Sequence, residues 1–209
     1  MLFFAESKVT KNNAIQKFLL SLQTKRNQMN IAVFCASSVP KNNDYIQASI
    51  TLGKEIARQG HTLVYGGSNL GTMGHISGAA LASGGEVIGV IPTFFSPEII
   101  HSQPVTKLIL VDTIAQRKEY IIHNCDAFIA LPGGIGTLDE ILEVMVAKQL
   151  NQTTNKPIVL YNPNGFFNHF IQQIDVMGDN GFFRSGRCPE ILQSDDIVNI
   201  LNLCISNNR

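Results

Sequence analysis

The sequence has no surplus of charge of either sign. Its 16 Lys and Arg residues balance 16 Asp and Glu residues, so the formal net charge at neutral pH is zero. Such a chain lacks the long-range attraction that draws proteins to nucleic acids and anionic membranes. Charged residues make up only 15% of the chain and apolar residues 44%, which favours a large buried core over disorder. We therefore expect neither a nucleic acid nor a membrane as a partner.

Metal and disulfide patterns are also missing. The four cysteines, Cys35, Cys125, Cys188 and Cys204, form no CxxC pair and no dense framework, which excludes the usual zinc-ribbon spacing and disfavours a disulfide scaffold. The five histidines show no HExxH or paired ligand spacing. We expect reduced thiols, a cytoplasmic location and no metal site.

Long apolar runs are absent as well. No run approaches the roughly 18 residues that span a bilayer. The first ten residues hold an apolar patch that is too short for a signal peptide and lacks a basic start. The sequence thus predicts neither a membrane span nor export.

From Ile31 onward, short apolar runs alternate with segments of helical spacing. The predicted strands are Ile31–Cys35, Leu63–Tyr65, Val87–Ile91, Leu108–Val111, Ala127–Leu131 and Ile158–Tyr161. The predicted helices are Tyr45–Arg58, His75–Ala82, Ile114–His123, Leu138–Leu150, Phe166–Met177 and Asp195–Ile205. This alternation predicts an α/β fold with a Rossmann-like, doubly wound, mainly parallel sheet and helices on both faces. In such a fold, ligands bind outside the carboxyl ends of the strands.

The first 28 residues differ from the rest. They are polar and rich in Asn and Gln, with one weakly amphipathic stretch around Ile15–Leu22. At roughly 150 residues per domain, 209 residues fit one domain with an appendage. We expect a flexible or helical extension over residues 1–28 and a single domain over residues 29–209.

Two glycine-rich turns follow predicted strands and precede predicted helices. The first contains Gly66, Gly67, Gly71 and Gly74, and the second runs from Pro132 to Thr137. Glycines at such a place let backbone amides face an anion at a helix N-terminus. A single turn of this kind is equally explained as a tight connection without a ligand, and neither turn is a GxGxxG motif or a P-loop. Together they outline an amide-lined crevice that suits a phosphate or a sugar phosphate.

Glu140 has two interpretations. Thr137 and Glu140 fit the spacing of a capping box, in which the glutamate accepts a hydrogen bond from the first amide of the helix, and spacing alone favours this structural role. The same position places Glu140 at the mouth of the crevice, beside any bound ligand. Asp139 is expected to be solvated.

A second capping box is predicted at Thr113 and Gln116, just before Arg117 and Lys118. Cations in the first turns of a helix are unfavourable unless an anion compensates them. The pair therefore suggests recognition of a phosphate or a carboxylate. Arg would bind it through its planar guanidinium and Lys through its single positive charge. An exposed surface pair is the alternative. Ser37, after the first strand, either contacts a ligand or caps a turn.

These segments resemble the LONELY GUY (LOG) family of nucleoside 5′-monophosphate phosphoribohydrolases, which are often labelled possible lysine decarboxylases. The matching segments are Ile31–Ser38, Tyr65–Gly74, Gly84–Pro92, Arg117–Lys118 and Pro132–Glu140. The family motif PGGxGTxxE is complete in the last of them. The resemblance covers residues 29 to 203.

The resemblance implies a nucleotide-binding catalytic domain that cleaves the N-glycosidic bond of AMP or N6-substituted AMP. The products would be the free base and ribose 5-phosphate, with no cofactor. It also implies a homodimer or higher homo-oligomer with sites near the subunit interface. By position, Arg117 and Glu140 match the catalytic pair of the family. The residues matched to substrate contacts are Ser37, Gly66, Gly67, Gly71, Thr72, Met73, Gly74, Lys118, Pro132, Gly133, Gly134, Gly136 and Thr137.

The residue types agree with this chemistry, because glycoside cleavage passes through an oxocarbenium-like state that a carboxylate stabilises while it orients or deprotonates water. Two alternatives remain. Carriers of the molybdenum cofactor have a similar fold and similar glycine turns but no evident need for a carboxylate at a sugar. A lysine decarboxylase would need a lysine that holds pyridoxal phosphate, and no segment marks one.

Overall fold

The computed structural model describes residues 28–95, 105–153, 156–183 and 190–208. The predicted extension over residues 1–28 lies outside the described residues except for Gln28, and Cys188 lies outside them too. No helix in the described ranges is long and apolar enough to cross a bilayer.

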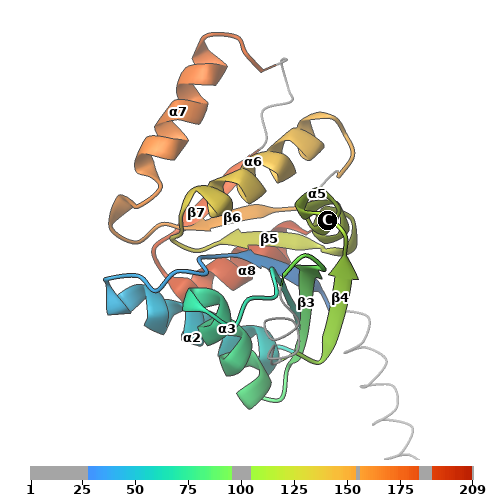
Figure 1. Cartoon of the computed structure of the whole chain (residues 1–209). Helices are drawn as coiled ribbons and strands as arrows, with labels where there is room; N and C mark the ends of the chain where they lie inside the picture. Colours follow the sequence, from blue (N-terminus) through green and yellow to red (C-terminus); the bar gives the residue numbers. More distant parts are fainter. Residues whose placement is uncertain (1–27, 96–104, 154–155, 184–189, 209) are drawn as a thin grey trace, which may run out of the picture.

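The described residues form one parallel sheet with the strand order β4-β3-β2-β1-β5-β6-β7 (Figure 1). The strands are β1 (Asn30–Phe34), β2 (Thr62–Tyr65), β3 (Glu86–Pro92), β4 (Lys107–Val111), β5 (Ala127–Ala130), β6 (Ile158–Tyr161) and β7 (Ile191–Ser194). The predicted doubly wound α/β fold is confirmed, and the six predicted strands occur within a residue of their predicted ends. β7 was missed.

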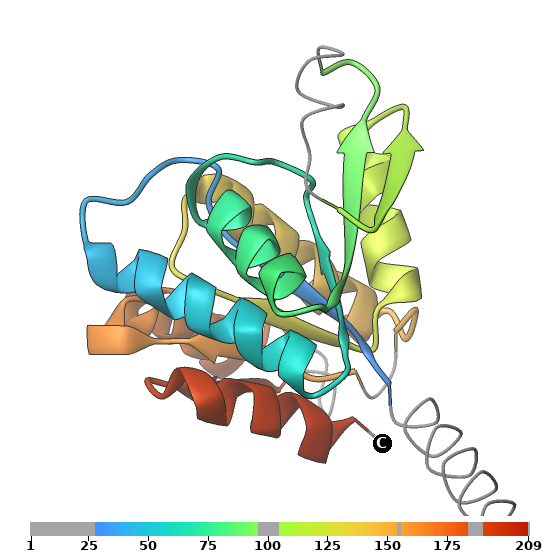
Figure 2. The ribbon, with the colours of Figure 1, turned by 90° about the horizontal axis from the view of Figure 1, so that it is seen from below.

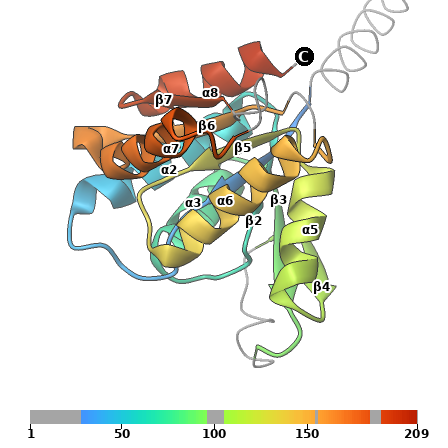
Figure 3. The same ribbon diagram turned by 90° about the horizontal axis from the view of Figure 1, so that it is seen from above.

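Helices cover both faces of the sheet. They are α2 (Asn43–Arg58), α3 (Gly71–Ala82), α5 (Ile114–Asn124), α6 (Ile135–Gln149), α7 (Asn168–Asp179) and α8 (Ile197–Asn207), with the 3₁₀ turn η1 (Pro163–Gly165) before α7. Figure 2 shows α2, α3 and α8 on one face, and Figure 3 shows α5, α6 and α7 on the other. The predicted helices are confirmed, but α3 and α6 begin earlier than their apolar spacing indicated, at glycine-rich turns.

Alternate residues of each strand supply two separate cores. Along β1, Ile31 and Val33 pack in the core that α2, α3 and α8 close. Ala32 and Phe34 belong to the core closed by α5, α6 and α7. Because both faces are buried, the strands read as nearly continuous apolar runs, which is typical of parallel sheets.

The strand order reverses between β1 and β5. From β1 the chain builds outward through β2, β3 and β4, then returns through α5 to β5 on the other side of β1. In open parallel sheets, a crevice forms outside the carboxyl ends of the strands at such a reversal. The loops after β1, β2 and β5 therefore border the candidate site.

Candidate functional site

The loop after β1 is fastened to the start of α3. The hydroxyl of Thr72 accepts a hydrogen bond from the Ala36 amide at 3.0 Å and donates one to the Ala36 carbonyl at 3.1 Å. The Met73 amide donates to the same carbonyl at 3.2 Å. Gly71 has a φ of +56°, and a Cβ there would lie 2.5 Å from the carbonyl oxygen of Ser38. This close approach, which only glycine permits, brings the Ser37–Ser38 loop onto the N-terminus of α3.

The turn after β2 meets a cation from α5. A Cβ added at Gly66 would lie 3.1 Å from Nη1 of Arg117 and 3.4 Å from Sδ of Met73. Gly67 has a φ of +80° and lies against β3 at Ile91. The first glycine turn therefore leaves room for the Arg117 guanidinium.

The turn after β5 leads directly into α6. Gly134 is the N-cap and no side chain caps the helix. A Cβ at Gly133 would lie 2.2 Å from the Thr137 hydroxyl, whereas at Gly134 and Gly136 it would meet nothing within 4 Å. The first amides of a helix lack intrahelical partners, so this open turn offers backbone donors to an anion.

The predicted capping box at Thr137 and Glu140 is wrong. Because α6 already begins at Ile135, Thr137 lies within the first turn and Glu140 in the second. Both side chains are buried, with Thr137 3% and Glu140 4% exposed. Glu140 has no capping role to explain its burial.

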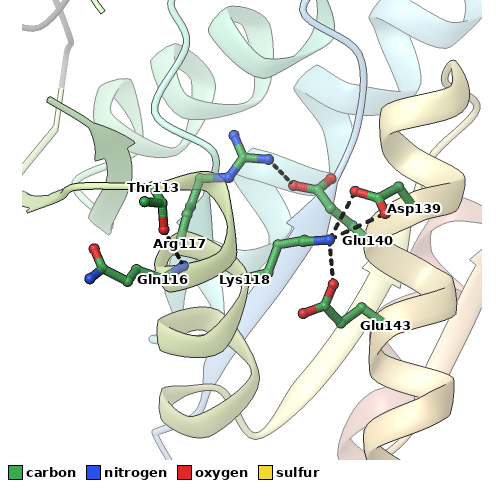
Figure 4. A network of polar contacts seen from close by, with 7 residues as sticks. All are labelled: Thr113, Gln116, Arg117, Lys118, Asp139, Glu140 and Glu143. Atoms are coloured by element: carbon green, nitrogen blue, oxygen red, sulfur yellow. Dashed lines mark hydrogen bonds and ion pairs between the residues drawn. The ribbon is translucent and has the colours of Figure 1, made fainter. Parts of the chain in front are cut away.

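Glu140 instead forms a buried ion pair with Arg117 (Figure 4). The Nη2 atom of Arg117 lies 2.5 Å from Oε1 of Glu140, and the side chains are 14% and 4% exposed. Burial raises the pKa of Glu140 to about 7, and the positive charge of Arg117 limits this rise. The Nε of Arg117 is also buried, and it has no hydrogen-bond partner among the described residues. A carboxyl group that titrates near neutral pH suits proton transfer at physiological pH.

Lys118 faces different partners from its neighbour. Its Nζ lies 3.1 and 3.2 Å from the two carboxylate oxygens of Asp139 and also pairs with Glu143. Burial lowers the pKa of Lys118, but the hydrogen bonds to Glu143 and Asp139 outweigh burial and raise it. Asp139, expected to be solvated, is 54% exposed and paired.

The predicted cap at the start of α5 is confirmed in its first half. The Thr113 hydroxyl accepts from the Gln116 amide at 3.1 Å. The Gln116 side chain, however, accepts from the Asp112 amide at 2.7 Å, one residue before the position of a capping box. The cap leaves Arg117 and Lys118 one turn into the helix, facing α6 (Figure 4).

Two residues near the site were missed from the sequence. Glu143 belongs to the Lys118 network, and its spacing of four residues from Asp139 on a helix was the signal that could have found it. Cys35, at the end of β1, lies close enough for the charge of Glu140 to affect it, although burial is the main cause that raises the pKa of its thiol to about 12. A lone buried cysteine gives no sequence signal for such a neighbour.

A groove of about 750 Å³ lies between α5 and α6, beside the ion pairs. Its lining mixes apolar side chains such as Leu142 and Val146 with the acids Glu119, Asp139 and Glu143. No three His, Cys, Asp or Glu residues within the described ranges are arranged to hold a metal ion.

Comparisons with known proteins point to one family. The family model described as "Possible lysine decarboxylase" matches residues 73–203. The cytokinin riboside 5′-monophosphate phosphoribohydrolase LOG of Oryza sativa is 41% identical over 152 residues, which are 73% of this chain and 62% of that protein. The phosphoribohydrolase LOG2 of Arabidopsis thaliana is 38% identical over 87% of this chain and 84% of its own length. The chain thus spans less than two thirds of the rice relative.

Solved structures share the fold. The molybdenum cofactor carrier protein of Chlamydomonas reinhardtii superposes with a TM-score of 0.63 at 23% identity, over 86% of this chain and 99% of that one. The molybdenum cofactor binding protein of Rippkaea orientalis gives 0.63 at 24%, over 86% and 96%. At this identity the likeness concerns the fold alone.

Proposed function

The chain belongs to the family described as possible lysine decarboxylase, which includes the LOG phosphoribohydrolases, and on that premise we propose that it is an N-glycosidase. Its substrate would be a purine nucleoside 5′-monophosphate, AMP or N6-substituted AMP such as a cytokinin riboside monophosphate. The products would be the free base and ribose 5-phosphate. The observation that carries the proposal is the buried Arg117–Glu140 pair beside the glycine turns.

The glycine turns would hold the sugar phosphate. The N-termini of α3 and α6 both lie at the carboxyl edge of the sheet, where their amides and helix dipoles favour a phosphate. We propose Arg117 and Glu140 as the catalytic pair. The residues proposed to line the substrate site are Ser37, Gly66, Gly67, Gly71, Thr72, Met73, Gly74, Pro132, Gly133, Gly134, Gly136 and Thr137.

Glu140 would act at the anomeric carbon. As the C1′–N bond breaks, its electron pair leaves with the base and positive charge develops on the ribose ring, which a carboxylate stabilises. Glu140 would orient a water molecule and take its proton as the water oxygen bonds to C1′. The leaving base takes up a proton from solvent, and Glu140 afterwards returns the proton of the water molecule to solvent, so atoms and charges balance. Arg117 would hold the carboxylate through Nη2, and its Nη1 atom, which lies against Gly66 of the first glycine turn, would help to position the nucleotide.

The test is the release of free base. The purified protein is incubated with AMP, N6-substituted AMP and pyrimidine monophosphates, and free base and ribose 5-phosphate are measured by chromatography. We expect purine release in equal amounts with ribose 5-phosphate. Nucleotide binding without turnover by any of these substrates would favour a non-catalytic carrier of a phosphorylated cofactor, which is the alternative that the shared fold leaves open.

We also propose that the protein is a homodimer or a higher homo-oligomer. An apolar stripe runs along α6, where Ile135, Leu142, Val146 and Leu150 are 87%, 42%, 51% and 59% exposed. Adjacent exposed apolar side chains commonly mark an interaction surface. Light scattering after size exclusion should give at least twice the 22.9 kDa chain mass, and Val146→Glu should lower it. A monomeric wild-type protein would reject this part of the proposal.

We propose a cytoplasmic location. Cys35, Cys125 and Cys204 are buried and unpaired, and free thiols are typical of reducing compartments. Localisation of a tagged full-length chain by fractionation tests this.

A further inference from the structure

Two neighbouring cations on α5 face a row of acids on α6. Arg117 pairs with Glu140, and Lys118 pairs with Asp139, the residue next to Glu140, and with Glu143 on the following turn. Figure 4 shows both cations extending from α5 to the same face of α6. The two ion-pair groups therefore lie side by side between the helices that carry the proposed catalytic pair.

The donors of Lys118 are already used. An ammonium group has three N–H donors, and Nζ of Lys118 has three oxygen partners, both oxygens of Asp139 and Oε2 of Glu143. A phosphate could bind Lys118 only by displacing one of these carboxylates. This arrangement argues against the anion-binding role that the sequence suggested for Lys118.

We propose that Lys118 is a positioning residue that acts on the reaction through Glu140 and does not bind the substrate directly. Its ammonium group offsets the negative charge of Asp139 and Glu143 and ties α5 to α6. The Glu140 carboxylate is thereby kept ionised and aligned with Arg117. This inference rests on the proposed function, because it assigns Lys118 a part in that reaction.

The charges around Glu140 give the physical reason. Arg117 and Lys118 face it from α5, Asp139 lies beside it on α6, and the Cys35 thiol approaches from β1. Besides the dominant effect of burial, the negative charge of Asp139 raises the pKa of Glu140, whereas the positive charges of Arg117 and Lys118 lower it. Without Lys118, the charges of Asp139 and Glu143 would no longer be neutralised, and ionising Glu140 would become less favourable.

The ion pairs of Lys118 with Asp139 and Glu143 should affect the titration of Glu140 more than they stabilise the fold. Asp139 is 54% and Glu143 37% exposed, and ion pairs with such solvent contact contribute little to stability. Loss of the Lys118 charge should therefore change the titration of Glu140 more than it changes folding.

The experiment measures the titration of Glu140 directly. Full-length protein is labelled with ¹³C at the glutamate carboxyl carbons, and the Glu140 signal is assigned by its loss in Glu140→Gln. The variants are Lys118→Met, which removes the charge, Lys118→Arg, which keeps it, and Asp139→Asn, which removes a negative charge beside Glu140. For each, the pKa of Glu140 and the pH profiles of kcat and KM for AMP are recorded.

We expect Lys118→Met to raise the pKa of Glu140 by about one unit and to lower kcat below neutral pH by up to tenfold with little change in KM. Lys118→Arg should restore the wild-type titration, and Asp139→Asn should shift it the opposite way. A Glu140 titration unchanged in both Lys118→Met and Asp139→Asn would overturn the inference, as would a rise in KM alone. If Lys118→Met does not fold, Asp139→Asn decides by itself, because an unshifted or raised pKa overturns the inference.

The titration also separates this inference from the proposed function. If neither the wild type nor any variant releases base from any nucleotide, the proposed function fails. The role of Lys118 in that reaction then fails as well, even if the NMR titration shifts as expected. If base is released but the titration does not respond to Lys118, the inference alone fails.

Discussion

The guanidinium of Arg117 and the carboxylate of Glu140 meet at 2.5 Å between α5 and α6, although 23 positions separate them in the chain. A buried charge pair is costly unless its geometry is good, and removing one partner leaves the other charge unpaired. This pair lies at the carboxyl edge of the sheet, next to Gly66 of the first glycine turn.

The rate should depend on the ionisation of Glu140. Burial raises the pKa of Glu140 to about 7, and in the proposed mechanism the carboxylate is the active form, so kcat/KM for AMP should fall roughly tenfold per pH unit below about pH 7. A pH profile of kcat/KM between pH 5 and 9 measures this. If kcat/KM instead falls only below about pH 4.5, the pKa of Glu140 is not raised in the free protein.

The stability of the protein should decrease as the pH rises through the pKa of Glu140. The pKa of Glu140 rises from its ordinary 4.5 to about 7 on folding, so the folded state binds the proton more tightly. The stabilisation is complete below about pH 4.5 and is lost as the pH rises through about 7. Glu140→Gln lacks this dependence. Relative to wild type, its free energy of unfolding should rise by about 3 kcal/mol between pH 4 and pH 8, as measured by urea titration. A constant difference across this range would contradict a pKa of Glu140 raised to about 7.

Gly71→Ala should destabilise the protein and loosen the loop after β1. The new methyl group would lie 2.5 Å from the Ser38 carbonyl, in a backbone conformation with φ of +56°, and we expect a loss of about 1–3 kcal/mol. Gly78→Ala is the matched control, because it lies in the same helix and its Cβ meets nothing within 4 Å. The control should be neutral or stabilising by up to about 1 kcal/mol. Equal thermal shifts for both variants would argue against the tight turn.

Thr72→Val should remove the hydrogen bonds that hold Ala36 against α3 and so destabilise the protein. The change removes both hydrogen bonds between the Thr72 hydroxyl and the Ala36 backbone, at a cost of about 1–3 kcal/mol. Thr72→Ser keeps the hydroxyl and should recover most of the stability. If Thr72→Val melts at the wild-type temperature while Thr72→Ser melts lower, the methyl packing of Thr72 matters and the hydrogen bonds do not.

The sheet could be predicted from the sequence because its strands are buried on both faces. Runs such as Phe128–Leu131 stand out against the polar turns around them, and their order predicts parallel pairing. β7 escaped because it lies at the edge of the sheet, where its residues are only partly buried or exposed, and it carries the polar Gln193 and Ser194.

The site was readable only in part. The glycine turns and the individual residues Arg117 and Glu140 were identified, but local spacing assigned Glu140 to a cap that does not form, since a Gly134 N-cap starts α6 earlier. The pairing of Arg117 with Glu140, and of Lys118 with Asp139, depends on how α5 packs against α6. No local pattern in the sequence encodes that tertiary contact.

The most direct test of the account compares Glu140→Gln with wild type on AMP. If Glu140 acts at the anomeric carbon, base release should fall by about 10²–10⁴-fold while the calorimetric Kd for AMP changes little, and Glu55→Gln on the distant helix α2 should behave as wild type. Undiminished release of adenine by Glu140→Gln would contradict the catalytic role of this carboxylate.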